Sequence, residues 1–253
     1  MAFSQLYTTS LELANEFQPY GKIQLVDDVS LSDENWFLVK KDDCLSLNGL
    51  LLNDFFSLSF NFLSGNLKYR TQHGGGRKEP LAKAIGLKNN ATPTVIDATA
   101  GMGREAFLLA SMGCQVTAYE RNPIIYFLLK DAVRRLENNG DFQIKKVSLQ
   151  VKHCNSIDTL GNLTVPLKPD VVYLDPMFPE RTKSAAVKKE MRIFKQLAGN
   201  DEDDAQLLKA SLGAALKRVV VKRPGQAPFI NNMKPDHQIL SKKHRFDVYV
   251  TAK

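Results

Sequence analysis

The sequence lacks any long apolar run. No hydrophobic stretch in its 253 residues approaches the roughly 20 residues that a bilayer-spanning helix needs. Residues 1–17 contain two glutamates and have neither a basic start nor an apolar centre, which argues against a signal peptide. We therefore expect a cytoplasmic protein.

Cysteine and histidine are scarce. The three cysteines are scattered, odd in number and without CxxC spacing, so we expect reduced thiols packed as small hydrophobic side chains rather than disulfides. None of the four histidines is paired at a spacing typical of metal ligands. The sequence therefore predicts no metal site.

The remaining composition is that of an ordinary globular protein, with 43% hydrophobic and 24% charged residues. The net charge of +7 is compatible with a polyanionic partner, although charge alone is weak support for one. The charge is regional: residues 201–204 are acidic, whereas residues 181–195 and 217–223 are basic. Any contact with nucleic acid is therefore expected near the basic segments.

The pattern of apolar residues changes near residues 86–94, and we predict two regions there. We expect residues 1–88 to form an N-terminal α+β region, with an initial helix over 1–17 and three short strands near 22–28, 36–43 and 55–62. The glycine-rich segment 73–77 could be a hinge, a phosphate-binding loop or a flexible linker, and a short helix follows it at 79–85.

Residues 89–253 alternate between strand and helix patterns. Continuous apolar runs of this kind are typical of parallel strands covered on both faces. The alternation predicts an α/β fold, namely a Rossmann-like, doubly wound and mostly parallel sheet. The expected strands are 94–99, 114–120, 147–151, 170–175, 218–222 and 245–251, and the expected helices are 103–113, 123–140, 184–197 and 203–216.

A glycine turn follows the first of these strands, in VIDATAGMGREAF at 95–107. Gly101 and Gly103 allow the backbone to pass close to a ligand while the next helix points its N-terminus at it. The turn is neither the dinucleotide fingerprint GxGxxG, because Arg104-Glu105 follows the second glycine, nor a phosphate-binding P-loop. A tight structural turn is the alternative interpretation.

Polar residues also end the next two strands. Glu120 could accept hydrogen bonds from a ribose diol, or it could be a surface acid. Asn155 and Ser156 lie where an open α/β sheet binds its ligand and could hold an adenine, but a solvated turn would have the same spacing.

The segment DPMFP at 175–179 combines a carboxylate with an aromatic ring. Asp175 and the carbonyls of a proline-stiffened turn could accept the N–H bonds of an amine. Phe178 could stack on a flat base, a contact worth about 1–3 kcal/mol. A base with an exocyclic amine would fit both groups, and we expect Asp175, Pro176 and Phe178 to be catalytic.

Together these motifs resemble the class I S-adenosylmethionine-dependent methyltransferases. DPMF is similar to the [DNS]-PP-[YFW] motif of enzymes that methylate exocyclic or amide nitrogens, with Met177 in place of the second proline. The ordered series HGGGR, IDATAGMGREAF, ERNP, YLDPMFP, KSAAVKKEMR, VVVKRP and HRFDVY resembles the bacterial 16S ribosomal RNA guanine-N2 methyltransferase RsmJ family. This resemblance runs from about residue 69 to 249, whereas the first 65 residues match poorly.

The resemblance implies S-adenosylmethionine as cofactor and 16S rRNA or the small ribosomal subunit as partner. It places the cofactor on Arg104-Glu105, on Glu120-Arg121 and on Asn155-Ser156, where this chain has Glu105 for the family's Asp and Asn155 for its first Ser. The complete set of expected cofactor contacts is Asp97, Gly101, Gly103, Arg104, Glu105, Glu120, Arg121, Asn155, Ser156 and Asp175.

Basic residues follow the DPMFP segment and end the strand at 218–222. They could meet phosphates beside the reacting base, although a solvated helical face is the alternative for the first group. The expected RNA contacts are Arg181, Lys183, Lys188, Lys189, Arg192, Lys222 and Arg223.

Three other functions stay open at this point. The chain could methylate another amine, in DNA adenine or cytosine or in protein glutamine. It could be a nucleotide-cofactor dehydrogenase, although it lacks GxGxxG. It could also bind RNA without catalysis.

Overall fold

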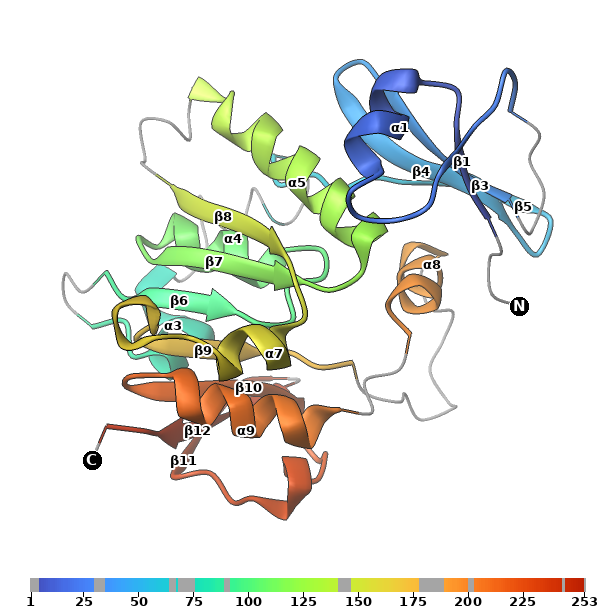
Figure 1. Ribbon diagram of the computed structural model, residues 1–253. Coiled ribbons are helices and arrows are strands. Elements are labelled where there is room, and N and C mark those ends of the chain that lie inside the picture. The colour runs from blue at the N-terminus through green and yellow to red at the C-terminus, as the bar shows by residue number, and fades with distance from the viewer. Residues whose placement is uncertain are drawn as a thin grey trace.

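The computed structural model describes residues 5–29, 35–63, 67, 76–88, 92–140, 147–177, 189–199, 203–242 and 244–252. These residues form two β-sheets, a small N-terminal one and a larger one that carries most of the helices (Figure 1).

The large sheet has the strand order β11-β12-β10-β9-β6-β7-β8. Strands β6 to β10 run parallel, and β12 and β11 join the β10 edge in antiparallel pairing. The chain moves outward from β6 in both directions, so the sheet has a switch point between β6 and β9. Its strands are β6 (Thr94–Asp97), β7 (Gln115–Glu120), β8 (Ser148–His153), β9 (Val171–Leu174), β10 (Arg218–Pro224), β11 (His237–Leu240) and β12 (His244–Val250).

Helices cover both faces of this sheet. Helices α3, α4 and α5 pack on one face, and α7 and α9 pack on the other (Figure 1). The helices are α3 (Pro80–Ile85), α4 (Arg104–Ser111), α5 (Pro123–Glu137), α7 (Ser156–Gly161), α8 (Lys189–Ala198) and α9 (Asp204–Ala214), with 3-10 turns η1 (Gly76–Lys78), η2 (Val165–Leu167) and η3 (Ile230–Asn232).

Alternation along each strand explains this arrangement. On β9, Val171 and Tyr173 belong to the core under α4 and α5, whereas Val172 and Leu174 belong to the core under α7 and α9. Successive side chains of a strand point to opposite faces, so a continuous apolar run serves two cores. The predicted α/β fold with a mostly parallel sheet is therefore confirmed.

The small sheet has the order β2-β1-β3-β4-β5 and carries α1 (Figure 1). The helix expected over 1–17 is only partly correct, because the structure has a strand, β1, before the helix α1. Strand β1 pairs in parallel with β2 and β3. Ser10 then caps α1 by accepting a hydrogen bond from the Leu13 amide at 3.3 Å. Strand β4, which the sequence analysis missed, is the central partner of β3 and β5. The elements are β1 (Gln5–Thr8), α1 (Leu11–Phe17), β2 (Gln24–Leu25), β3 (Asn35–Lys41), β4 (Cys44–Leu51) and β5 (Asp54–Leu58).

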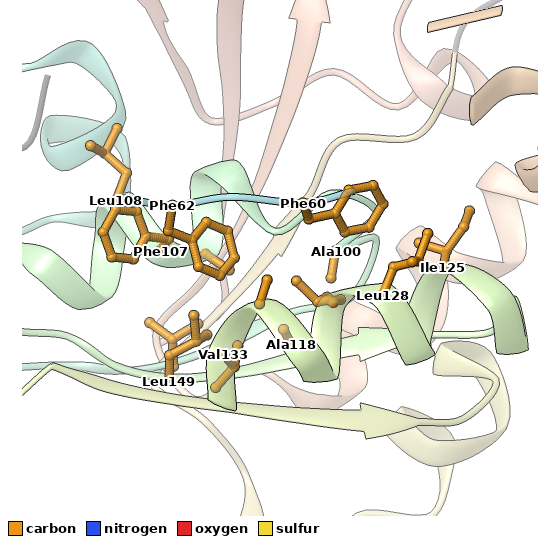
Figure 2. Packing of buried hydrophobic residues seen from close by; sticks show 14 of the residues in the cluster. Phe60, Phe62, Ala100, Phe107, Leu108, Ala118, Ile125, Leu128, Val133 and Leu149 are labelled. Carbon is orange, nitrogen blue, oxygen red and sulfur yellow. The ribbon is translucent and has the colours of Figure 1, made fainter. Parts of the chain in front are cut away.

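The small sheet shares its hydrophobic core with α4 and α5. Phe60 and Phe62, which follow β5, lie over these helices, and the Phe62 ring stacks on Phe107 with centroids 4.8 Å apart (Figure 2). Buried Asp131 of α5 accepts a hydrogen bond from the Leu45 amide of β4 at 3.1 Å. The division of the chain at residue 88 stays a prediction, and α3, which precedes it, packs on β10, β11 and β12 of the large sheet.

Within the described residues, no helix is long and apolar enough to cross a membrane.

Candidate active site

The carboxyl ends of β6, β7, β9 and β10 surround a cavity of about 460 Å³. Open α/β sheets bind ligands at this place, next to the switch point of the strand order. The volume lies in the usual range for small-molecule sites. Among the described residues that the sequence analysis proposed, the cavity lining includes Asp97, Gly101, Arg104, Glu105, Glu120, Arg121, Asn155, Ser156, Asp175, Pro176, Lys222 and Arg223.

The two glycines of the turn after β6 have different surroundings. Gly101 lines the cavity with φ +53°, and a Cβ there would lie 2.8 Å from the Phe194 ring of α8. Gly103 caps α4 with φ +69° and is not among the lining residues; a Cβ there would lie 2.5 Å from Leu129 of α5. Gly101 therefore shapes the cavity wall, whereas Gly103 allows helix packing.

Glu120 ends β7 beneath the glycine turn and is 8% exposed. Its carboxylate accepts hydrogen bonds from the Gly101 amide at 3.0 Å and from the Asn122 amide at 2.7 Å. Burial raises its pKa, and these two amides partly counteract the shift. Glu120 thus ties the second strand of the site to the glycine turn, at the edge of the cavity.

Asp97 ends β6 and is 2% exposed. One of its oxygens accepts a hydrogen bond from the Thr99 amide at 3.2 Å. Burial raises its pKa well above the usual value, and the nearby acids Glu105, Asp175 and Glu120 add to the shift. A cationic ligand would relieve this concentration of acidic groups.

Asp175 follows β9 and is held by contacts from two directions. Its backbone amide donates to Thr99 Oγ1 at 2.7 Å, and its Oδ2 accepts a hydrogen bond from Lys222 Nζ at 2.7 Å. Lys222 also donates to Glu105 Oε1 at 2.7 Å, so one ammonium bridges two carboxylates from different elements.

The charges of this group determine its protonation. Burial raises the pKa of Asp175 to about 6; the ammonium of Lys222 opposes this shift and Glu105 adds to it. Burial also disfavours the charge of Lys222, but the carboxylates of Asp175 and Glu105 outweigh burial and raise the Lys222 pKa above its ordinary value. The bridge is therefore a charged one near neutral pH.

The polar residues after β8 and β7 are occupied by local contacts. Asn155 caps α7 by accepting from the Ile157 amide at 2.9 Å, and Ser156 donates to the Ala98 carbonyl at 2.6 Å. Arg121 donates to Asp203 at 2.7 Å. These contacts place all three side chains at the cavity, where the sequence analysis expected them to bind the cofactor. Their role in cofactor binding stays a prediction.

The basic residues proposed for RNA binding differ in where they lie. Those outside the described residues are Arg181, Lys183 and Lys188, together with the side chain of Lys189. Phe178 of the proposed catalytic set also lies outside the described residues. Arg192 is exposed on α8.

Lys222 and Arg223 lie inside the protein rather than on an exposed surface. The side chain of Lys222 is 17% exposed and that of Arg223 is 3% exposed. Arg223 donates to the Pro228 carbonyl at 2.6 Å and lies 3.6 Å from Asp204.

Sequence reasoning missed Thr99, Asn122 and Phe194. Thr99 positions the backbone of Asp175, and its hydroxyl could have been noticed between the acid and the glycines of the turn. Asn122 caps α5 and donates to the Leu197 carbonyl of α8 at 2.7 Å. Phe194 covers Gly101 from α8, and no local signal links these residues, which are distant in sequence.

This arrangement fits S-adenosylmethionine. The cofactor carries a sulfonium and an ammonium, and the cavity offers the carboxyl groups of Asp97, Glu105, Glu120 and Asp175. Asn155 and Ser156 supply polar groups at the end of β8, while Met177 and Phe194 supply apolar wall. The described residues contain no group of histidines, cysteines and acids that could hold a metal ion.

Comparison with known proteins shows the family to which the chain is similar. A family model described as "Putative SAM-dependent methyltransferase" matches residues 22–251. Proteins named ribosomal RNA small subunit methyltransferase J are similar to the chain: that of Shewanella amazonensis is 47% identical (88% of this chain, 86% of the relative) and that of Tolumonas auensis is 51% identical (76% and 77%). The crystal structure of a SAM-dependent methyltransferase from Neisseria gonorrhoeae is 33% identical, covers 98% of this chain and 96% of its own, and superimposes with a TM-score of 0.75.

The match to the Neisseria gonorrhoeae structure covers 98% of the chain and so includes the small N-terminal sheet, whereas the family model begins at residue 22. These similarities remove the dehydrogenase alternative, because the matching family transfers methyl groups. The chain belongs to the ribosomal RNA small subunit methyltransferase J family of SAM-dependent methyltransferases.

Proposed function

We propose that this protein transfers the methyl group of S-adenosylmethionine to the exocyclic N2 of a guanine near the 3′ end of 16S rRNA. The observation that carries the proposal is the place of Asp175-Pro176 at the end of β9, beside a cavity lined by the glycine turn and Glu120. The names of the relatives support small-subunit rRNA as the substrate.

The residues proposed to hold the cofactor surround the cavity at the ends of four strands, β6, β7, β8 and β9. They are the ten expected contacts of the sequence analysis, except that Gly103 contributes by shaping the turn rather than by lining the cavity. When bound there, S-adenosylmethionine supplies an already electrophilic methyl group. The main tasks of the protein are therefore to align the target nitrogen and to exclude water.

Asp175 is the proposed partner of the target amine. The lone pair of guanine N2 is delocalised into the ring, which makes it a poor nucleophile. A carboxylate that accepts an N2–H hydrogen bond favours rehybridisation of the nitrogen and stabilises the positive charge that develops during attack. As the N–C bond forms and the S–C bond breaks to leave S-adenosylhomocysteine, Asp175 would take the proton that the nitrogen loses, directly or through a neighbouring group. Pro176 is buried and stiffens the turn behind Asp175, and Phe178 is proposed to stack on the base.

We propose that the RNA backbone meets the protein near α8. Arg192 is exposed there and follows Arg181, Lys183, Lys188 and Lys189 in the chain. Positive side chains beside the reacting base would orient the substrate through its phosphates and make its binding dependent on salt. The cytoplasmic location expected from the sequence stays a prediction.

Mapping of 16S rRNA modifications by mass spectrometry tests the proposal. RNA from a strain that lacks the gene should lose one N2-methylguanosine near the 3′ end. The purified protein, given labelled S-adenosylmethionine, should restore that modification on RNA or small subunits from the same strain. An unchanged modification map contradicts the proposal.

The same labelled cofactor separates the remaining alternatives. Transfer of label to DNA or to protein glutamine, with none to rRNA, would assign another amine as the substrate. Binding of rRNA without transfer of label would assign an RNA-binding protein that is not an enzyme.

A further inference from the structure

Lys222 donates hydrogen bonds to two carboxylates that line the cavity, those of Glu105 and Asp175. It comes from β10, while Glu105 comes from the first turn of α4 and Asp175 from the end of β9. The two contacts span 117 and 47 residues of sequence. This bridge connects three elements at the point where the target amine is proposed to bind.

The surroundings of Lys222 differ from those of an RNA-binding lysine. Its side chain is 17% exposed, and its ammonium donates to two acids of the cavity instead of pointing into open solvent. Two of the three N–H groups of this ammonium are used by the carboxylates, and a phosphate that approached the third would bring its negative charge beside both acids. The position is therefore better suited to acting on the carboxylates themselves.

We propose that Lys222 is a positioning residue for methyl transfer, which holds Asp175 as a carboxylate and orients it toward the target amine. This inference rests on the proposed role of Asp175. An ammonium within hydrogen-bond distance of a buried acid favours the charged form of the acid. Lys222 donates a hydrogen bond to Asp175 Oδ2, and the Asp175 amide donates to Thr99 Oγ1. These two contacts hold Asp175 in place and leave Oδ1 as the oxygen that can meet the substrate.

Ionised Asp175 matters because only the carboxylate accepts a hydrogen bond at both oxygens. The pKa of Asp175 is about 6 with Lys222 present. The ammonium of Lys222 lowers the pKa of Asp175, so its removal should raise that pKa further above the ordinary value of an aspartate. Near neutral pH much of Asp175 would then be protonated.

Other titratable and charged groups face this site from every surrounding element. They include the imidazole of His244 on β12, so the pH profile must be compared between variants rather than interpreted alone. These groups are Asp97 on β6, Arg104 and Glu105 on α4, Glu120 and Arg121 at β7, Lys195 on α8, Asp203 before α9, Arg223 on β10 and His244 on β12.

Lys222→Met tests the inference, because it keeps an unbranched side chain only one atom shorter and removes the charge. The rate of methyl transfer to 16S rRNA should decline with acid at a pH about 1–3 units higher in the variant than in wild type. The ratio of the wild-type rate to the variant rate should therefore be at least about fivefold larger at pH 6 than at pH 9. The dissociation constant for S-adenosylmethionine should change less than kcat. Lys222→Arg, which keeps the charge, should retain a midpoint near that of wild type.

A second measurement does not depend on the substrate. Carbon-13 NMR of labelled aspartate carboxyls, with the Asp175 signal assigned from Asp175→Asn, should show the titration midpoint of Asp175 rising in Lys222→Met by the same amount. An unchanged midpoint overturns the inference even if rRNA is the substrate. A raised midpoint in a protein that methylates no rRNA supports the effect of Lys222 on Asp175 and contradicts the proposed function instead.

Lys217→Met is the matched control. Lys217 also pairs with an aspartate, Asp170 at 2.8 Å, but it is 61% exposed and lies at the opposite end of β9 and β10. Its loss should leave the pH profile and the Asp175 midpoint unchanged. If Lys222→Met does not fold, as judged by thermal unfolding, Lys222→Gln supplies the neutral variant for both measurements.

Discussion

At the scale of single residues, the site depends on acids that the fold keeps out of water. Asp97 and Glu120 are nearly fully buried at the ends of their strands, and Asp175 shares a lysine with Glu105. Burying charged groups is costly unless they are paired or accept hydrogen bonds, and each of these acids has such a contact. Acids with raised pKa values that converge on one cavity are typical of functional sites.

Asp175→Ala should abolish methyl transfer and leave the fold intact. Loss of a group that stabilises developing charge lowers kcat by roughly 100-fold or more. Lys222 keeps Glu105 as a partner in this variant, so no buried charge is left without one. Labelled-methyl transfer measures the loss, and circular dichroism checks the fold.

Asp158→Ala is the control for this variant. Asp158 is an exposed acid on α7, so its removal should leave the rate of methyl transfer unchanged. Near-normal activity of Asp175→Ala would contradict the role assigned to Asp175.

At the scale of elements, the glycine turn and α8 set the shape of the cavity. The turn begins at the buried end of β6 and leads into α4, and α8 covers it through Phe194. Asn122 holds α8 in place by donating to the Leu197 carbonyl while it caps α5. Segments that are distant in sequence therefore complete the wall of the site.

Gly103→Ala should destabilise the protein by about 2 kcal/mol or more. A left-handed backbone costs a non-glycine residue about 1–2 kcal/mol, and the new Cβ would lie 2.5 Å from Leu129 and 3.1 Å from Phe62. Urea denaturation measures the change in the free energy of unfolding.

Gly213→Ala provides a control of opposite sign. Gly213 lies within α9, and a Cβ there would meet nothing within 4 Å. This variant should gain up to about 1 kcal/mol, because alanine favours a helix more than glycine does. Equal stability of the two variants would show that the turn tolerates a side chain at Gly103.

At the scale of the whole molecule, the two sheets share a core. Phe62 and neighbouring residues of the N-terminal region pack against α4 and α5 (Figure 2). Buried Asp131 accepts from the Leu45 amide of β4 and from Arg135 at 2.8 Å, which fixes the small sheet to α5. The N-terminal region therefore supports α4 and α5, the helices beside the proposed cofactor site.

The two sheets should unfold together. Trp36, the only tryptophan in the sequence, is fully buried in the small sheet, so its fluorescence reports on that sheet, whereas far-ultraviolet circular dichroism reports on the whole chain. We expect coincident urea transitions for the two signals. Phe62→Ala should lower the free energy of unfolding by about 3–5 kcal/mol and so move both transitions to lower urea concentrations.

Phe55→Ala is the control for the loss of a phenylalanine. Phe55 is 52% exposed on β5, and its removal should cost less than about 1 kcal/mol. A fluorescence transition that separates from the circular dichroism transition would instead support two independently folding regions.

The sequence by itself determined most strands and helices of the large sheet, because continuous apolar runs and glycine or proline boundaries are local signals. It missed the short elements β11 and α7. It also determined which acids follow those strands, and hence that Asp97, Glu120 and Asp175 meet at one edge of the sheet. The motifs in their order were sufficient to identify the family.

Only the tertiary structure decided which groups these acids contact. From the sequence, Lys222 is one of several basic residues expected to contact RNA. Its pairing with Asp175 and Glu105 depends on β10 lying next to β9. The packing of Gly103 on Leu129, and of the small sheet on α5, likewise joins segments far apart in the chain. Contacts of this kind leave no periodic trace in a single sequence, because each partner satisfies only the local rules of its own element.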